Sequence, residues 1–286
     1  MKFSISHFND IKKIPKTIIP YLNQKPAINF EAIGILEQLS DNYQSFQGIL
    51  ECIVVSEKEQ LKVVTCRIRP YNLLISHSTN IDSISPLVEY FLENNISIPG
   101  IYGPTKEVNL FSELWQNLSG EDFQSSDEFL QYSMNARIGE SQLIGEISIA
   151  QQEHKELLTD WTEKSIREII PQSTDEFVKA CTDSFLKLLE LNKVFILEVE
   201  KNPVSMAAVS GETKSMLAIN DVYTPPEHRG KGYATELCLF LSKYILDDCK
   251  KKPILWVKAS NHAAIHIYEK IGFEKVAKMA LCLKEN

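Results

Sequence analysis

Two glycines separated by one residue, Gly230 and Gly232, mark the part of this chain most suited to chemistry. Glycine has no Cβ, so its backbone adopts left-handed angles and lets a ligand approach closely. The expected strand Met216–Tyr223 precedes these glycines and an amphipathic helix follows them. The first amides of that helix converge on one point, where the helix dipole favours negative charge. Because Arg229 and Lys231 add positive charge, the segment predicts a diphosphate site.

The spacing of the segment decides which diphosphate fits. A Walker A loop needs Ser or Thr after Gly-Lys, whereas Gly232 follows Lys231 here. A Rossmann fingerprint needs a small residue where Thr235 stands and an acid at the end of the next strand, whereas Asp247 and Asp248 fall at a helix end. Both of these patterns fit poorly. A plain tight turn followed by a helix cap explains the segment on its own equally well.

A second pattern lies downstream and separates these alternatives. Ile254–Lys258 is rich in strand-forming residues, and a helix follows that Ser260 or Asn261 caps and Gly272 ends. A last apolar alternation then predicts a final strand. Asn261 and Tyr268 are two helical turns apart, so they share one face of the helix.

Together the two patterns resemble the GNAT N-acetyltransferase superfamily. Arg229-x-x-Gly232-x-Ala234 is similar to its coenzyme A pyrophosphate loop, and the series Asn261, Tyr268, Gly272-Phe273 is similar to its second motif. The resemblance covers roughly residues 206–283 at the level of motifs and extends to the first half only in the order of elements. It implies an α/β (α+β) fold and acetyl-CoA (coenzyme A) as the bound cofactor.

The resemblance also assigns roles to residues. It implies that the coenzyme is held by Val222, Tyr223, Thr224, Arg229, Gly230, Lys231, Gly232, Tyr233, Ala234 and Asn261. The edge of the strand at Asn220–Thr224 can pair with the pantetheine arm as an added strand does. By analogy with the family, a backbone N–H around Val222 would stabilise the oxyanion.

Proton transfer requires a donor and an acceptor. Tyr268 has an ordinary pKa of about 10, so it is protonated at neutral pH and can donate to the leaving thiolate. Asp221, expected on the side of its strand that carries Ile219 and Tyr223, is the candidate base, and Glu198 is its rival. A core-packed tyrosine and a hydrogen-bonding aspartate are the structural alternatives.

The resemblance therefore implies transfer of an acetyl group to a primary amine by direct attack on the thioester. The acceptor is a small-molecule or peptide amine. The alternative is a non-catalytic acyl-CoA-binding regulatory module, and a Rossmann-type nucleotide binder is a distant third.

Composition narrows the classes of partner. The chain has 286 residues, of which 44% are hydrophobic, and a net charge of −8, which argues against binding a nucleic-acid backbone. Six scattered cysteines form no C-x-x-C pair, so we expect reduced core residues and no metal site. No apolar stretch approaches membrane-spanning length, so we expect a cytoplasmic protein without membrane contact, as a monomer or a homodimer.

The order of the expected elements predicts two tandem GNAT-like mixed-sheet domains, 1–138 and 139–286. Each half reads as three strands, a helix, a strand, a helix and a strand, with Phe129–Ile138 closing the first half. Two long helices, Glu153–Ile170 and Thr174–Leu191, precede these elements in the second half, and the resemblance implies that they line the acceptor site. The first copy is degenerate: His77–Asp82 replaces the glycine loop, so we expect it to bind no coenzyme.

Overall fold

The computed structural model describes residues 2–41, 48–136 and 144–284. The described residues form two compact units, each of which we treat by itself. Unit 1 contains those of Met1–Gln131, Val257–Ser260 and Lys275–Asn286. Unit 2 contains those of Tyr132–Trp256 and Asn261–Glu274.

Both units contain the same sequence of elements. Unit 1 runs β1 (Ser4–Phe8), α1 (Ile18–Leu22), α2 (Phe30–Asp41), β2 (Ile49–Glu57), β3 (Gln60–Arg69), β4 (Leu73–Ile75), α3 (Ile84–Glu93), β5 (Gly100–Pro104), α4 (Thr105–Ser119) and β6 (Phe123–Ser133). Unit 2 runs β7 (Glu146–Ile149), α5 (Lys155–Ile169), α6 (Asp175–Glu190), β8 (Val194–Val199), β9 (Asn202–Glu212), β10 (Met216–Tyr223), α7 (Tyr233–Lys243), β11 (Lys252–Lys258) and α8 (His262–Lys270). The chain then ends in β12 (Glu274–Lys284). The predicted repeat of element order is therefore confirmed.

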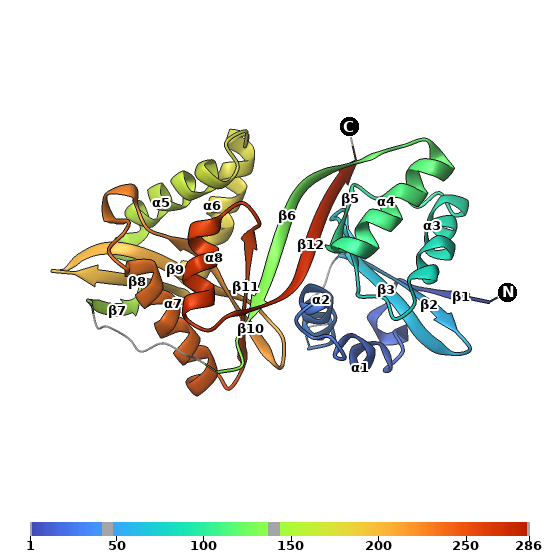
Figure 1. The fold of residues 1–286 in the computed structure, drawn as a ribbon, viewed down its shortest axis with the longest axis horizontal. Coiled ribbons are helices and arrows are strands. Elements are labelled where there is room, and N and C mark those ends of the chain that lie inside the picture. Colours follow the sequence, from blue (N-terminus) through green and yellow to red (C-terminus); the bar gives the residue numbers. More distant parts are fainter. Residues whose placement is uncertain (1, 42–47, 137–143, 285–286) are drawn as a thin grey trace. The chain divides into compact units, whose positions relative to one another are not determined.

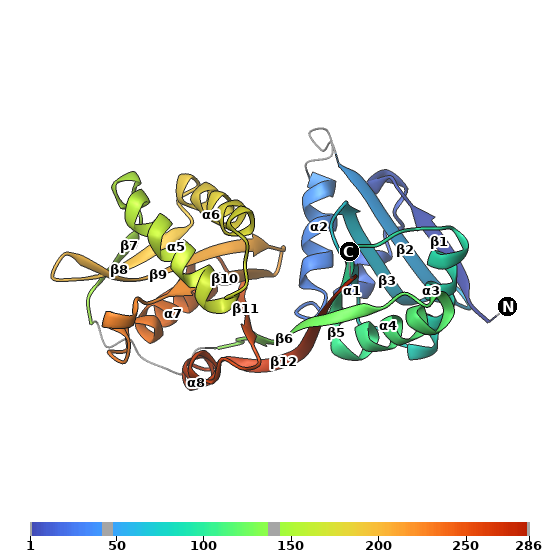
Figure 2. The same cartoon turned by 90° about the horizontal axis from the view of Figure 1, so that it is seen from above.

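Strand pairing repeats as well. In unit 1, β1 to β4 pair antiparallel in sequence order, and β4 pairs parallel with β5. In unit 2, β7 to β10 pair antiparallel, and β10 pairs parallel with β11. Helices cover both faces of the strands of unit 2: α5 and α6 lie on one face and α7 and α8 on the other (Figure 2). Each unit is thus a mixed α/β sandwich.

The last strand of the chain does not stay with the second half. β12 pairs antiparallel with β5, with Ala280 opposite Gly103 and Cys282 opposite Ile101 (Figure 1). Unit 1 therefore takes its closing strand from the carboxy-terminal end of the chain, and its first continuous segment ends at Gln131 rather than at residue 138. The independence of domains 1–138 and 139–286 stays a prediction.

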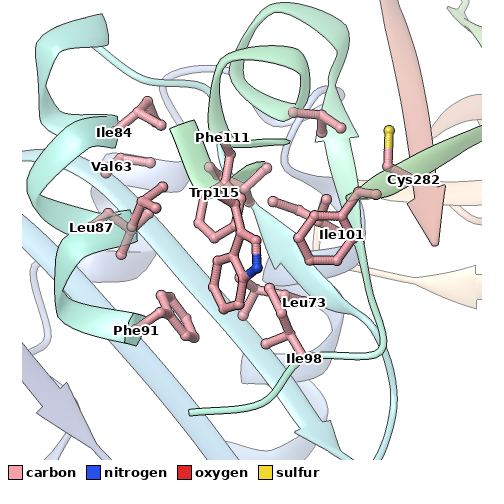
Figure 3. Packing of buried hydrophobic residues seen from close by; sticks show 14 of the residues in the cluster. Val63, Leu73, Ile84, Leu87, Phe91, Ile98, Ile101, Phe111, Trp115 and Cys282 are labelled. Carbon is pink, nitrogen blue, oxygen red and sulfur yellow. The ribbon is translucent and has the colours of Figure 1, made fainter. Parts of the chain in front are cut away.

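Alternation along the strands gives unit 1 two cores. On β2, Cys52 and Val54 face α1 and α2, whereas Ile53 and Val55 face α3 and α4. The second of these cores is aromatic, with the rings of Phe111 and Trp115 stacked 5.7 Å apart (Figure 3). All six cysteines are free, and Cys52, Cys66, Cys238 and Cys282 are buried, as expected for core thiols.

One expected strand differs in position. β6 starts at Phe123 instead of Phe129, while its expected end at Ile138 lies outside the described residues. Among the helices formed by the described residues, none is long and apolar enough to cross a membrane.

Candidate functional site

The glycine turn is built as its sequence predicts. Gly230 and Gly232 have φ angles of +77° and +85°, and Gly232 is the N-cap of α7. Among the residues that the structure describes, a Cβ placed at Gly230 would meet no atom within 4 Å, and one at Gly232 would meet a methyl of Ile144 at 3.4 Å. No described residue therefore fills the space above Gly230. The first four amides of α7 have no partner within the helix, so the turn can bind an anion such as a pyrophosphate.

The side chains around the turn surround this anion site. Lys231 is exposed, and Tyr233 and Ala234 are half-buried at the start of α7. The rings of Tyr233 and His228 lie 6.4 Å apart. A ligand at the turn would thus contact backbone amides, one mobile ammonium group and an aromatic edge.

The pairing of β10 with β11 stops before the glycine turn. This parallel pairing covers Met216–Ala218, and the antiparallel pairing of β10 with β9 shifts register between Asn220 and Tyr223. Asp221, at φ +53°, lies in this irregularity, which is a β-bulge. The pairing with β11 thus stops before the segment Asn220–Thr224, which leaves that part of the edge available to an extended ligand.

The bulge makes the expected alternation of side chains along β10 wrong at Asp221. We expected Asp221 to share a side with Ile219 and Tyr223, but these two are buried and Asp221 is exposed. The left-handed residue adds a position to the strand, so the period of two fails there. Although the residue is exposed, surrounding protein atoms desolvate its carboxyl, which raises the pKa of Asp221 to about 6. Desolvation raises the pKa of Cys181 on α6, and the charge of Asp221 adds to that rise.

Arg229 takes part in a cluster that the sequence did not predict. Its Nε donates to the Thr224 carbonyl at 2.9 Å, and its Nη2 donates to Glu168 Oε2 of α5 at 2.6 Å. The Tyr223 hydroxyl donates to the other oxygen of Glu168 at 3.3 Å. Glu168 is near the end of a long amphipathic helix, and nothing in its spacing relative to the glycine turn singles it out.

Tyr268 lies on α8, which packs against α7. The residue is 7% exposed, and its ring meets Phe273 edge-on at 6.0 Å. Desolvation raises the pKa of Tyr268 above its ordinary value, and the charge of Cys238 on α7 adds to that rise. The phenol is therefore protonated at neutral pH, as a proton donor must be.

Asn261 and Glu198 also have defined surroundings. Asn261 is the N-cap of α8, and its Oδ1 accepts from the Ala264 amide at 3.1 Å. Glu198 faces Glu146 across the β7–β8 pair, beside a groove that Lys201 also lines. Because like charges directly opposite each other are unfavourable, this pair favours a nearby cation. Within residues 2–41, 48–136 and 144–284, no three His, Cys, Asp or Glu side chains converge on a metal position.

Comparison with known proteins adds to this geometry. Residues 199–281 match the family model described as FR47-like protein. An 87-residue stretch is 30% identical to an uncharacterized N-acetyltransferase of Methanocaldococcus jannaschii, over 28% of this chain and 38% of that protein. The chain thus spans about two fifths of that curated relative.

Solved structures match nearly the whole chain. A GNAT-family acetyltransferase from Colwellia psychrerythraea aligns over 99% of this chain and 100% of its own, with a TM-score of 0.60 and 13% identity. A tandem GNAT protein from the clavulanic acid biosynthesis pathway aligns over 98% of both chains, with a TM-score of 0.53 and 10% identity. At these identities the likeness concerns the fold, and it extends over both units.

Proposed function

We propose that this chain, which has the GNAT acetyltransferase fold and matches the FR47-like family over residues 199–281, is an acetyl-CoA-dependent N-acetyltransferase acting on a primary amine. One observation carries the proposal: Gly230 and Gly232 are both left-handed at the N-terminus of α7, and no described residue lies within 4 Å of a Cβ placed at Gly230. This turn fits a pyrophosphate because a Cβ at Gly230 would occupy the space above it. The FR47-like match spans the same segment.

The residues that would hold the coenzyme come from three elements. The amides from Gly230 to Ala234 would bind its pyrophosphate, with Lys231 as a mobile counter-charge, and the edge at Asn220–Thr224 would pair with its pantetheine arm. Asn261, the N-cap of α8, would add a contact to the coenzyme, as the resemblance to the family implies. When bound, acetyl-CoA supplies an acetyl group activated as a thioester.

The chain's own groups then move protons. Asp221 is mostly ionised at neutral pH, because its pKa of about 6 lies below it, and can take a proton from the ammonium form of the acceptor. A backbone amide at Val222, next to the bulge, is the candidate donor to the developing oxyanion. Tyr268 can give its proton to the sulfur that leaves.

A calorimetric titration with acetyl-CoA and an assay for free thiol across a panel of amines test the proposal. Binding followed by thiol release with some amine supports it, and Tyr268→Phe should slow the release by about 10²-fold. Absence of acetyl-CoA binding would overturn it.

A non-catalytic acyl-CoA-binding module is the second candidate. The burial of Tyr268 favours it, because a phenol that packs in the core needs no catalytic role. Tight coenzyme A binding without turnover of any amine, together with a Tyr268→Phe variant equal to wild type, would decide for this alternative. A competition experiment tests the Rossmann-type nucleotide binder: displacement of bound coenzyme A by NAD would support it, and no displacement would exclude it.

A further inference from the structure

Four groups of unit 2 meet where β10 runs into the glycine turn. They are the Arg229 guanidinium, the Glu168 carboxylate, the Tyr223 ring with its hydroxyl, and the Thr224 carbonyl. Arg229 donates to Thr224 at 2.9 Å and to Glu168 at 2.6 Å, and its guanidinium carbon lies 5.7 Å from the centre of the Tyr223 ring. The chain's own atoms therefore engage the guanidinium on three sides.

These contacts close the segment that leads into the turn. The bond from Arg229 to Thr224 spans Pro225–His228 and ties its two ends together. Tyr223 is 5% exposed, so the ring beneath the guanidinium is a fixed surface. Glu168 reaches this junction from α5 and contacts both the guanidinium and the Tyr223 hydroxyl with separate oxygens. Glu168 thus links the junction to α5, as does Trp161, whose ring lies 6.3 Å from that of Tyr223.

We infer that Glu168 is a positioning residue for the coenzyme site, acting through Arg229. The carboxylate holds the guanidinium across Thr224 and Tyr223, which fixes the direction in which the turn presents its amides. In this arrangement Arg229 ties together the ends of the segment Pro225–His228 through its bond to Thr224, and the amides from Gly230 to Ala234 hold the phosphates. The inference rests on the proposed function and names a residue in α5 on which coenzyme affinity depends.

The test measures coenzyme A binding by calorimetry at low salt for wild type, Glu168→Gln and Asp160→Asn. Asp160 is the matched control, since it is also a half-exposed acid of α5 paired with a cation, Lys164 of the same helix. Glu168→Gln should weaken binding about three- to fivefold, because both side chains of its ion pair are roughly half exposed and such pairs are weak. Asp160→Asn should bind as wild type does.

A double variant shows whether Glu168 acts through Arg229. Glu168→Gln combined with Arg229→Gln should bind no more weakly than Arg229→Gln alone, because the second change removes a partner already lost. In turnover assays Glu168→Gln should raise the KM for acetyl-CoA by the same factor and leave kcat within about twofold.

Several results would overturn the inference. Tighter binding by Glu168→Gln would mean that the carboxylate competes with phosphate for Arg229. A loss of kcat of about 10²-fold at unchanged KM would make Glu168 a proton acceptor. Equal binding by wild type and Glu168→Gln would remove the positioning role alone, whereas a wild-type protein that binds no coenzyme A would overturn the proposed function together with this role.

Discussion

The two units follow one plan, and they differ at the same place, the junction after the fourth strand. In unit 2, β10 leaves β11 after Ala218 and the chain passes through an open glycine turn. In unit 1, β4 pairs with β5 at Leu73 and Leu74, and Gly103 of β5 packs directly against the Ile75 backbone. The fourth strand thus separates from the fifth before the turn in unit 2, whereas its end stays in contact with the fifth strand in unit 1.

The loop after β4 in unit 1 also differs from the glycine turn after β10 in unit 2. In unit 1, the amide of His77 donates to Asn29 Oδ1, that of Ser78 donates to the Glu107 carboxylate at 2.9 Å, and that of Thr79 donates to a backbone carbonyl. Glu107 is 3% exposed, so a buried carboxylate of the chain itself lies where an anion would bind. The first copy therefore lacks more than the glycines, because amides of its loop already donate to groups of the chain itself.

The closure of unit 1 can be broken at Gly103. A Cβ there would lie 2.4 Å from the Ile75 carbonyl oxygen, and backbone cannot move aside cheaply. Gly103→Ala should therefore lower the free energy of unfolding by about 1–3 kcal/mol, as overpacking does. Chemical denaturation measures this loss. Coenzyme A binding should persist wherever the variant remains folded, and loss of binding by a folded variant would contradict the assignment of the site to unit 2.

The carboxylate in the loop of unit 1 offers the next test. Glu107→Ala removes the acceptor of the buried Ser78 amide, which should cost about 1–3 kcal/mol of stability. Calorimetry of wild type and of the folded variant should still give one coenzyme A per chain, because Gly103 still packs against the Ile75 backbone beside this loop. Two coenzymes per chain in wild type would end the distinction between the copies.

Two glycines make it possible to distinguish the cost of backbone strain from a loss of coenzyme A binding. Gly230 and Gly120 are both left-handed, at φ +77° and +76°, and a Cβ at either would meet no described residue within 4 Å. Alanine at each position should cost about 1 kcal/mol through strain alone. Gly230 is in the turn of unit 2, whereas Gly120 ends α4 of unit 1.

Only Gly230→Ala should weaken coenzyme A binding, since its methyl group would enter the anion site. Calorimetry compares the two variants at equal fractions folded. Equal affinities would show that the coenzyme does not contact the turn at Gly230.

Much of this arrangement follows from local chemistry and was predictable. β10 has the predicted bounds, Thr174 caps α6 as one of two expected residues, and the repeat of element order emerged from hydrophobic patterns. Turn residues at helix ends and alternation in strands are short-range signals, so a single sequence carries them. The placement of Asn261 as a cap followed from the same kind of signal.

Features that depend on distant partners or on unusual backbone were missed. The hairpin of β8 and β9 turns at Glu200 and Lys201, which are both left-handed although neither is Gly or Asn, so the usual turn signal is absent there. The bulge at Asp221 carried a weak signal, because Asn-Asp is uncommon inside strands. The contact of Glu168 with Arg229 and the pairing of β12 with unit 1 depend on long-range packing, which local patterns do not encode.

The smallest expected effects are pH dependences, and each unit provides one carboxyl for comparison. Burial raises the pKa of Glu31 in unit 1 to about 7, and desolvation raises that of Asp221 in unit 2 to about 6. A raised pKa means that folding disfavours the ionised form, so stability falls as pH rises from the unfolded value to the folded one. For Glu31 that window runs from about pH 4.5 to about pH 7.

Activity should separate the two carboxyls. A base must be ionised, so kcat/KM should fall as pH drops through about 6, and Asp221→Asn should lower it and remove that inflection. Glu31→Gln should leave the rate profile unchanged and reduce the loss of stability toward pH 8. Rate profiles from pH 5 to 8 and denaturation at both ends measure these effects. If Asp221→Asn keeps the wild-type profile, proton removal belongs to another group, and Glu198→Gln becomes the variant that should change the profile.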